Sequence, residues 1–215
     1  MRTLELFCGE NKSFSEFMKI HDNSCECITL DFNKKTNPTI CEDILKWDYS
    51  IYAPGYFDII WASPDCVNYS VIQYTHKHRK SPEQIEENLK YSDSLVIKML
   101  EIIKYFNPPV WYIENPNGLM KTRECMKPYK DNMLMCDYCM YSDWGYRKRT
   151  CIWTNKSDVC LKTCDKKCNN MIMNPKSGRL NHKMRLGFTK EINPDKSSRA
   201  DKHRIPIDLI KDLII

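Results

Sequence analysis

The feature that most constrains the fold of this 215-residue chain is a series of short apolar runs, each ending in a polar residue or a turn. The runs are residues 2–7, 25–30, 39–40, 57–61 and 110–113. Short runs bounded by turn residues are typical of strands that are buried on both faces of a parallel sheet. Because helical segments alternate with the runs, we expect an α/β fold with a doubly wound, mostly parallel sheet and helices on both faces.

The helices have sequence signals of their own. Residues 13–21 carry apolar side chains at helical spacing. A stronger signal begins at Ser81, which can cap a helix, and Gln84 completes a capping box. The helix should end before Pro108 and Pro109. The remaining expected elements are strands at 133–141 and 150–153 and an amphipathic C-terminal helix at 206–215.

Composition limits the class of protein. The chain is 42% hydrophobic and 28% charged, which is ordinary for a globular protein with one sizeable core. No apolar run approaches the ~20 residues of a membrane span, and the N-terminus does not resemble a signal peptide. Twelve cysteines without a secretory signal favour reduced thiols, metal ligation or catalysis over disulfides. We therefore expect an intracellular, monomeric protein with no membrane partner.

Polar residues at the ends of the runs indicate a site at one edge of the sheet. Gly9 lies in a turn where the backbone can approach a ligand, and Asp31 can accept both hydroxyls of a ribose. Cys66 and Glu114 each follow an apolar run, and chemistry in open α/β sheets collects at this edge. A thiolate and an acid together suit addition of sulfur to an electron-poor ring while the acid activates a ring nitrogen.

Four motifs stand in the order and rough spacing of the C5-cytosine DNA methyltransferases. They are Glu5-Leu6-Phe7-Cys8-Gly9, Ser63-Pro64-Asp65-Cys66, Glu114-Asn115-Pro116 and Arg147-Lys148-Arg149. Residues 1 to about 155 resemble this family, and most closely its short members from phages and large DNA viruses. The resemblance implies a Rossmann-like methyltransferase fold, S-adenosylmethionine as cofactor and DNA as partner.

The resemblance also implies which residues bind the cofactor. By position, Phe7, Gly9 and Pro64 would line its site and Asp31 would bind the ribose. Asp43 with Ile44 would meet the adenine.

The catalytic roles likewise follow from the resemblance. Cys66 resembles the nucleophile that attacks C6 of cytosine, and Glu114 resembles the acid that engages N3 and the exocyclic amine. Arg147 and Arg149 resemble the arginines that support the nucleophile and the flipped nucleotide. Attack at C6 makes C5 nucleophilic enough to take the methyl group, and the family flips its target base out of the duplex because C5 and C6 are unreachable in the stack.

The chain departs from the family pattern at three places. Asp65 precedes the cysteine where the family usually has proline, and a carboxylate there should raise the pKa of the thiol. Tyr146 precedes the first arginine where glutamine is common, and no family-type closing motif occurs near the C-terminus.

The resemblance and these departures leave three candidate functions. The first is methylation of cytosine C5 in DNA, and the second is the same reaction on RNA such as tRNA. The third is a catalytically weakened protein that binds the cofactor or DNA.

After the catalytic motifs the composition of the sequence changes, and Cys, Lys and Asn become frequent while apolar residues become few. We expect a catalytic domain at 1–155, a small basic, cysteine-containing region at 156–200 that acts as a reduced target-recognition element, and a helix at 201–215 that packs back on the core. Thiolates at this spacing suit structural zinc. The expected ligands are Cys139, Cys160, Cys164 and Cys168, with His182 as a substitute; free surface thiols are the alternative.

Basic residues gather in two places, and the net charge is +5, which is compatible with a polyanionic partner. The first is the loop His76-Lys77-His78-Arg79-Lys80. The second is diffuse and comprises Lys162, Lys166, Lys167, Lys176, Arg179, Lys183 and Arg185. The basic residues of the second region suit contacts to phosphates rather than base edges. Because the family usually carries a large target-recognition domain and only residues 156–200 are available here, we expect short or degenerate sequence specificity.

Overall fold

The computed structural model describes residues 1–71, 80–175, 177–184 and 203–215. Its main element is a seven-stranded sheet in the order β3-β2-β1-β4-β5-β7-β6. The strands are β1 (Arg2–Leu6), β2 (Glu26–Asp31), β3 (Ile40–Cys41), β4 (Ile59–Ala62), β5 (Val110–Pro116), β6 (Met133–Asp137) and β7 (Arg149–Thr154). Pairing is parallel from β3 through β5, whereas β7 runs antiparallel to both of its neighbours. The predicted mostly parallel sheet is confirmed.

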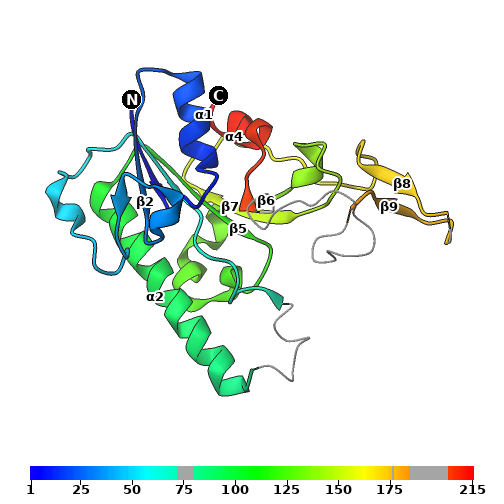
Figure 1. Ribbon diagram of the computed structural model, residues 1–215, viewed down its shortest axis with the longest axis horizontal. Helices are drawn as coiled ribbons and strands as arrows, with labels where there is room; N and C mark the ends of the chain where they lie inside the picture. The colour runs from blue at the N-terminus through cyan, green and yellow to red at the C-terminus, as the bar shows by residue number, and fades with distance from the viewer. Residues whose placement is uncertain (72–79, 176, 185–202) are drawn as a thin grey trace.

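Helices cover both faces of this sheet, as predicted (Figure 1). On one face lies α2 (Pro82–Phe106), which contributes Val96 and Met99 to a core that includes Leu4 and Ile60. On the other face lie α1 (Ser13–His21) and α4 (Ile207–Ile214), packed against each other and over Trp61. Each central strand is therefore buried on both sides, which explains its continuous apolar sequence.

The termini of α2 follow the sequence signals closely. The Ser81 hydroxyl accepts a hydrogen bond from the Gln84 amide, and the Gln84 side chain accepts one from the Ser81 amide. The helix ends at Asn107, which adopts a left-handed conformation with φ 43°. These contacts satisfy backbone groups that a helix end leaves unpaired.

The structure differs from the expected elements after residue 137. The strand expected at 133–141 ends at Asp137, and Tyr138–Met140 forms a 3-10 turn in which the Tyr141 amide donates to the Tyr138 carbonyl. An apolar run alone does not distinguish a buried strand from a buried turn. A two-stranded sheet of β8 (Met171–Met173) and β9 (Leu180–His182) was not expected, because its strands are short and contain no buried residue.

None of the helices among the described residues is both long and apolar enough to cross a membrane.

Candidate active site

A cavity of about 190 Å³ opens where the parallel strands end. Six of the predicted site residues line it: Phe7, Gly9, Asp31, Pro64, Cys66 and Glu114. They come from the carboxyl ends of β1, β2, β4 and β5, which the parallel pairing brings to one edge. The other two residues expected at the cofactor are not among its lining residues. Ile44 is buried in the core, and the Asp43 carboxylate accepts a hydrogen bond from the Leu45 amide.

The end of this cavity that Gly9 and Asp31 form is held by backbone hydrogen bonds to the Asp31 carboxylate. This buried carboxylate accepts from the Gly9 amide at 2.9 Å and from the Asn33 amide at 2.8 Å. Gly9 has a φ of +59° and open space where a side chain would begin. Phe7 also adopts a positive φ of 57°, a strained conformation for a non-glycine residue that is often found at functional sites.

Sequence reasoning missed an aromatic residue at this end. Phe32 follows Asp31, lines the cavity and is 78% exposed. Phe32 lies two residues after the end of the apolar run at 25–30, so its position next to Asp31 at the end of a predicted strand was a signal that the sequence alone contained.

The loop that carries Cys66 is fixed at three points. The Asn115 side chain donates to the Pro64 carbonyl at 2.8 Å, and the Leu119 amide donates to the Tyr69 carbonyl at 2.8 Å. The third point is the Tyr69 hydroxyl, which donates to Asp93 on α2 at 2.8 Å. The segment after β5 therefore positions the loop after β4.

Asp65 is directed into its own turn. Its carboxylate accepts a hydrogen bond from the Val67 amide at 3.1 Å, and the residue is exposed. The carboxylate still acts on its neighbour: the pKa of the Cys66 thiol is raised to about 11 by burial, and Glu114 and Asp65 add to the increase. Lys148 opposes them and lowers the thiol pKa. Near neutral pH, therefore, the resting Cys66 is a thiol.

Two residues that the sequence did not predict contact Glu114. The buried Tyr138 hydroxyl donates to a Glu114 carboxylate oxygen at 2.8 Å. The Lys148 ammonium lies 3.9 Å from the same oxygen and also lines the cavity. The carboxyl group is thus held between a phenol and an ammonium group.

The structure places the two predicted arginines differently from the expected role. Arg147 and Arg149 both bind the carboxylate of Asp137, each through two nitrogens at 2.8–3.1 Å, and neither is among the lining residues of the cavity. The reason is the alternation of an extended chain, which sends residues 147 and 149 to one side and Lys148 to the other. Burial by itself raises the pKa of Asp137, but the two arginine hydrogen bonds outweigh it and lower this pKa to about 2.

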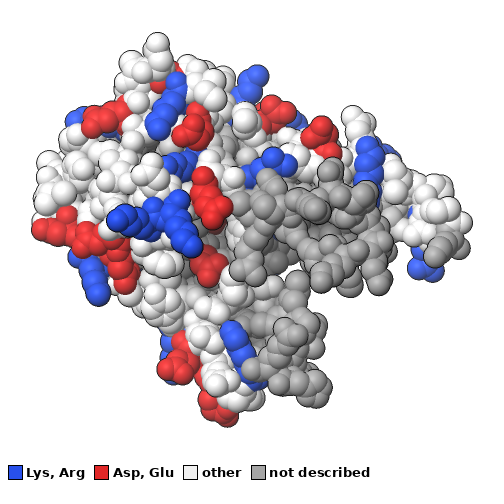
Figure 2. Space-filling model, in the orientation of Figure 1, with Lys and Arg blue, Asp and Glu red and all other residues white. Residues whose placement is uncertain are grey.

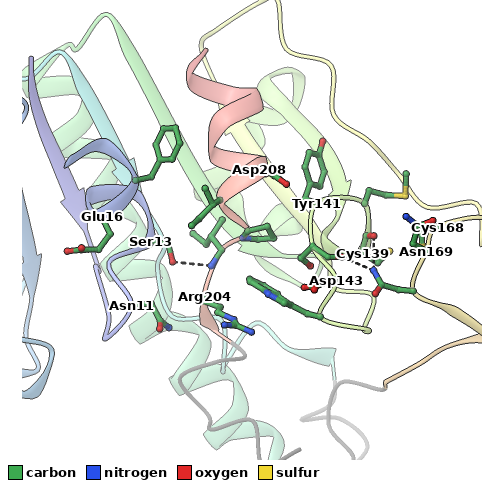
Figure 3. A pocket seen from close by; sticks show the side chains of 18 of the residues that line it. Asn11, Ser13, Glu16, Cys139, Tyr141, Asp143, Cys168, Asn169, Arg204 and Asp208 are labelled. Atoms are coloured by element: carbon green, nitrogen blue, oxygen red, sulfur yellow. Dashed lines mark hydrogen bonds between the residues drawn. The ribbon is translucent and has the colours of Figure 1, made fainter. Parts of the chain in front are cut away.

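The C-terminal segment completes the cavity. His203 and Ile205 line it, and the Ile205 amide donates to the Ser13 hydroxyl at 3.1 Å, a bond drawn as a dashed line in Figure 3. This contact was not predicted, because the segment lacks the family's closing motif.

A larger cavity of about 880 Å³ lies beside the first and contains neither Cys66 nor Glu114. It is lined by α1, the turn at 139–144 and the start of α4, and Arg204 stacks on the Trp144 ring with 4.1 Å to its centroid (Figure 3). Because Cys66 and Glu114 lie in the smaller cavity, we assign the reaction to that cavity and not to this larger one.

Three of the four predicted metal ligands lie together. Cys139, Cys164 and Cys168 form a group with His182, in which the ligand atoms all lie within 4.8 Å of one another. Cys160 is exposed and lies outside this group, so His182 takes the fourth position. We call these four residues the Cys/His cluster.

The predicted basic loop at 76–80 lies outside the described residues except for the exposed Lys80, and Lys176 and Arg185 of the second basic region also lie outside them. Among the described members, Lys162 pairs with Asp212 at 2.7 Å and Lys167 with Asp165 at 3.2 Å. Basic and acidic side chains are interspersed over the described residues of the face in Figure 2. This face has no continuous basic patch among those residues.

Sheet order, the antiparallel seventh strand and a cavity at the strand ends define the Rossmann-like methyltransferase fold class. The chain is 33% identical to the "Probable DNA (cytosine-5)-methyltransferase" of Frog virus 3 over 232 residues, covering 100% of this chain and 99% of the relative. The chain therefore belongs to the DNA (cytosine-5)-methyltransferase family.

Other comparisons are more distant. The S. pombe Dnmt2 methyltransferase matches with a TM-score of 0.48 and 14% identity over 75% of this chain and 52% of its own. An antibiotic-related methyltransferase matches with a TM-score of 0.44 and 10% identity over 72% of this chain and 87% of its own. The chain thus spans about half the length of the Dnmt2 structure. No family model matches the sequence.

Proposed function

We propose that this protein transfers a methyl group from S-adenosylmethionine to C5 of cytosine in DNA. The observation that carries the proposal is that Cys66 and Glu114 line the same cavity as Gly9 and Asp31. A nucleophile, an acid and a nucleoside-binding edge are all needed for this reaction, and they come from four adjacent parallel strands.

The residues at the cofactor end fit a nucleoside-containing ligand. Each carboxylate oxygen of Asp31 accepts one backbone hydrogen bond and keeps a lone pair for a ribose hydroxyl. The exposed Phe32 offers a ring face to a base, and the open space at Gly9 admits a ligand close to the backbone. S-adenosylmethionine supplies an electrophilic methyl group when bound. We also propose that the Cys/His cluster binds a structural zinc ion.

The chemistry of the remaining residues follows from their contacts. The sulfur of Cys66 adds to C6 of a flipped cytosine while Glu114 holds a proton at N3, and the electron pair of the ring becomes available at C5. After C5 takes the methyl group, loss of the C5 proton and departure of the sulfur restore the ring. Tyr138 and Lys148 orient Glu114, and Lys148 favours the thiolate of Cys66.

The test is transfer of a labelled methyl group to duplex DNA. Wild-type protein should label DNA, Cys66→Ser should label none, and Cys41→Ser, which changes an exposed cysteine, should match wild type. Equal labelling by wild type and Cys66→Ser would contradict the proposed nucleophile. Labelling of tRNA in place of DNA would change the substrate and keep the chemistry.

A second function is favoured by one observation, the pKa of about 11 for the Cys66 thiol, with Asp65 beside it. A thiol that is so rarely ionised suits a protein that binds the cofactor or DNA and turns over slowly. Calorimetric binding of S-adenosylmethionine without modification of any cytosine offered would support this second function over the first.

A further inference from the structure

We propose that Cys139, Cys164, Cys168 and His182 bind one zinc ion, and that this ion positions, through Asp137, the strand that delivers Lys148 to the methyl-transfer cavity. The second half of this inference rests on the proposed function. The first half rests only on the Cys/His cluster.

The spacing of the cluster matches tetrahedral zinc. Bonds of about 2.3 Å from zinc to sulfur and about 2.0–2.1 Å to nitrogen place sulfur and nitrogen about 3.6 Å apart in a tetrahedron. The Nε2 atom of His182 lies 3.6 Å from the sulfur of Cys164 and 3.5 Å from that of Cys168. The Lys166 amide donates to the Cys164 sulfur at 3.3 Å, a contact that stabilises a thiolate.

Four protein ligands fill a tetrahedral zinc site and leave no position for water or substrate. None of the four lines the cavity that holds Cys66. The ion is therefore structural rather than catalytic. Figure 3 shows Cys139 and Cys168 among the residues that line the larger pocket.

The segment around the cluster needs such an ion because it has little core. The two strands of the β8–β9 hairpin have three residues each, and Ile172, Met173 and Leu180 are 45%, 61% and 42% exposed. An isolated pair of short strands is at best marginally stable in water. A metal that joins β9, the 164–168 loop and the 3-10 turn at residue 139 replaces the missing core.

A short path of hydrogen bonds joins the cluster to the active site. The amide of Cys164, a ligand, donates to the Asp137 carboxylate at 2.8 Å. The same carboxylate, fully buried, binds both Arg147 and Arg149. Lys148 lies between these arginines and reaches Glu114 from the opposite side of the strand. Fixing the loop at residue 164 therefore fixes the position of Lys148.

A second anchor supports the same turn. The buried Asn170 side chain donates to the carbonyls of Cys139 and Ser142 and accepts from the Gly145 amide. Residues 139–145 are thus held by Asn170, and residues 147–149 are held by Cys164 through Asp137.

Metal content tests the ligand set. We expect about one zinc per chain in the purified wild type and in Cys160→Ser, and loss of zinc in Cys164→Ser and Cys168→Ser. Cobalt titrated into metal-free protein should give the visible absorption of a tetrahedral thiolate site in wild type and Cys160→Ser only. Wild-type protein that contains no zinc and gives no cobalt spectrum would overturn the site, as would loss of zinc in Cys160→Ser with retention in Cys168→Ser.

The alkylation rate of Cys66, followed on its own peptide by mass spectrometry, tests the coupling without requiring methyl transfer. The charged groups that act on this thiol are Lys148, Glu114 and Asp65. Removing zinc by chelation should slow alkylation by about threefold to tenfold as Lys148 moves away, and returning zinc should restore it. Asp137→Asn should keep zinc, because its side chain still accepts from Cys164, and should slow alkylation similarly.

Equal alkylation rates with and without zinc would overturn the coupling and leave the metal site standing. A protein that binds zinc and shows the coupling, yet neither binds S-adenosylmethionine nor methylates DNA, would overturn the proposed function alone.

Discussion

At the scale of single residues, the reactivity of Cys66 depends on Lys148, a residue to which the motif Arg147-Lys148-Arg149 assigned no role. Burial, Glu114 and Asp65 all raise the thiol pKa, and Lys148 lowers it. The neighbouring arginines, to which the family resemblance assigns support of the nucleophile, both bind Asp137. The positive charge at the cavity therefore comes from Lys148, the residue between the two arginines.

We expect Lys148→Met to raise the pKa of Cys66 further, because it removes the positive charge beside the thiolate. Alkylation of Cys66 at mildly alkaline pH should slow by about threefold to tenfold, since one pKa unit changes the thiolate fraction tenfold. The matched control Lys148→Arg keeps the charge and should stay near the wild-type rate. Identical rates for the methionine and arginine variants would show that the charge is irrelevant.

The shared location of residues that end a strand could be predicted from the sequence, and the positions of other residues could be predicted only in part. Gly9, Asp31, Cys66 and Glu114 each follow an apolar run, so the fold alone brings them to one cavity. The fourth member of the Cys/His cluster was named only as a substitute. Spacing along an irregular loop does not reveal which cysteine points inward, and Cys160 points to solvent.

At the scale of elements, the close approach of two loops holds Cys66, the proposed nucleophile. A methyl group added at Gly118 would lie 2.5 Å from the Tyr69 carbonyl oxygen, and that carbonyl also accepts from the Leu119 amide. Backbone must move to relieve such a contact. The loop after β5 thus packs so closely against the loop after β4 that position 118 has no room for a side chain.

We expect Gly118→Ala to cost about 1–3 kcal/mol of unfolding free energy, the usual range for overpacking, and to reduce methyl transfer because it displaces the Cys66 loop. Urea unfolding and the labelled-methyl assay measure the two effects. The control is Val67→Ala, which trims an exposed side chain in the same loop. Wild-type stability and activity in Gly118→Ala would mean that the loops do not need this approach.

Element prediction was most successful where the chain obeys a single periodicity. The capping box and apolar stripe of α2 depend on local sequence, so its start at Pro82 and its end at Phe106 were expected. The boundary after Asp137 was not, because β6 passes directly into a buried turn whose residues are as apolar as the strand. The β8–β9 hairpin was missed because it lacks an alternating apolar pattern.

At the scale of the whole molecule, the sheet buries an acid close to the cavity. Glu5 lies in the middle of β1 at 3% exposure, and its carboxylate accepts a hydrogen bond from the Ser15 amide at 3.0 Å. Burial raises its pKa from 4.5 to about 7, more than the Ser15 hydrogen bonds lower it. The folded protein therefore holds a proton that the unfolded chain releases.

The stability of the molecule should accordingly depend on pH. Since the folded pKa of Glu5 is the higher one, its contribution is fully present below about pH 4.5 and is lost as pH rises to about 7, a change on the order of 3 kcal/mol. Glu5→Gln keeps an acceptor for Ser15 and should flatten the curve over this window. Urea unfolding at several pH values measures it, with the exposed Glu87→Gln as control. Parallel curves for wild type and Glu5→Gln would contradict the prediction.

The cavity draws its walls from distant parts of the chain, and this has a practical consequence. Phe7, Asp31 and Cys66 lie in the first 71 residues, whereas Glu114, Lys148 and Ile205 lie after residue 80. A chain cut between Ser70 and Ser81 yields two fragments, neither of which holds the proposed nucleophile, Cys66, together with the proposed acid, Glu114. They meet along the β4–β5 pairing, where four residue pairs join the halves. Under the proposed function, the two fragments fused to two proteins that bind each other would form a split reporter that methylates DNA where those two proteins meet.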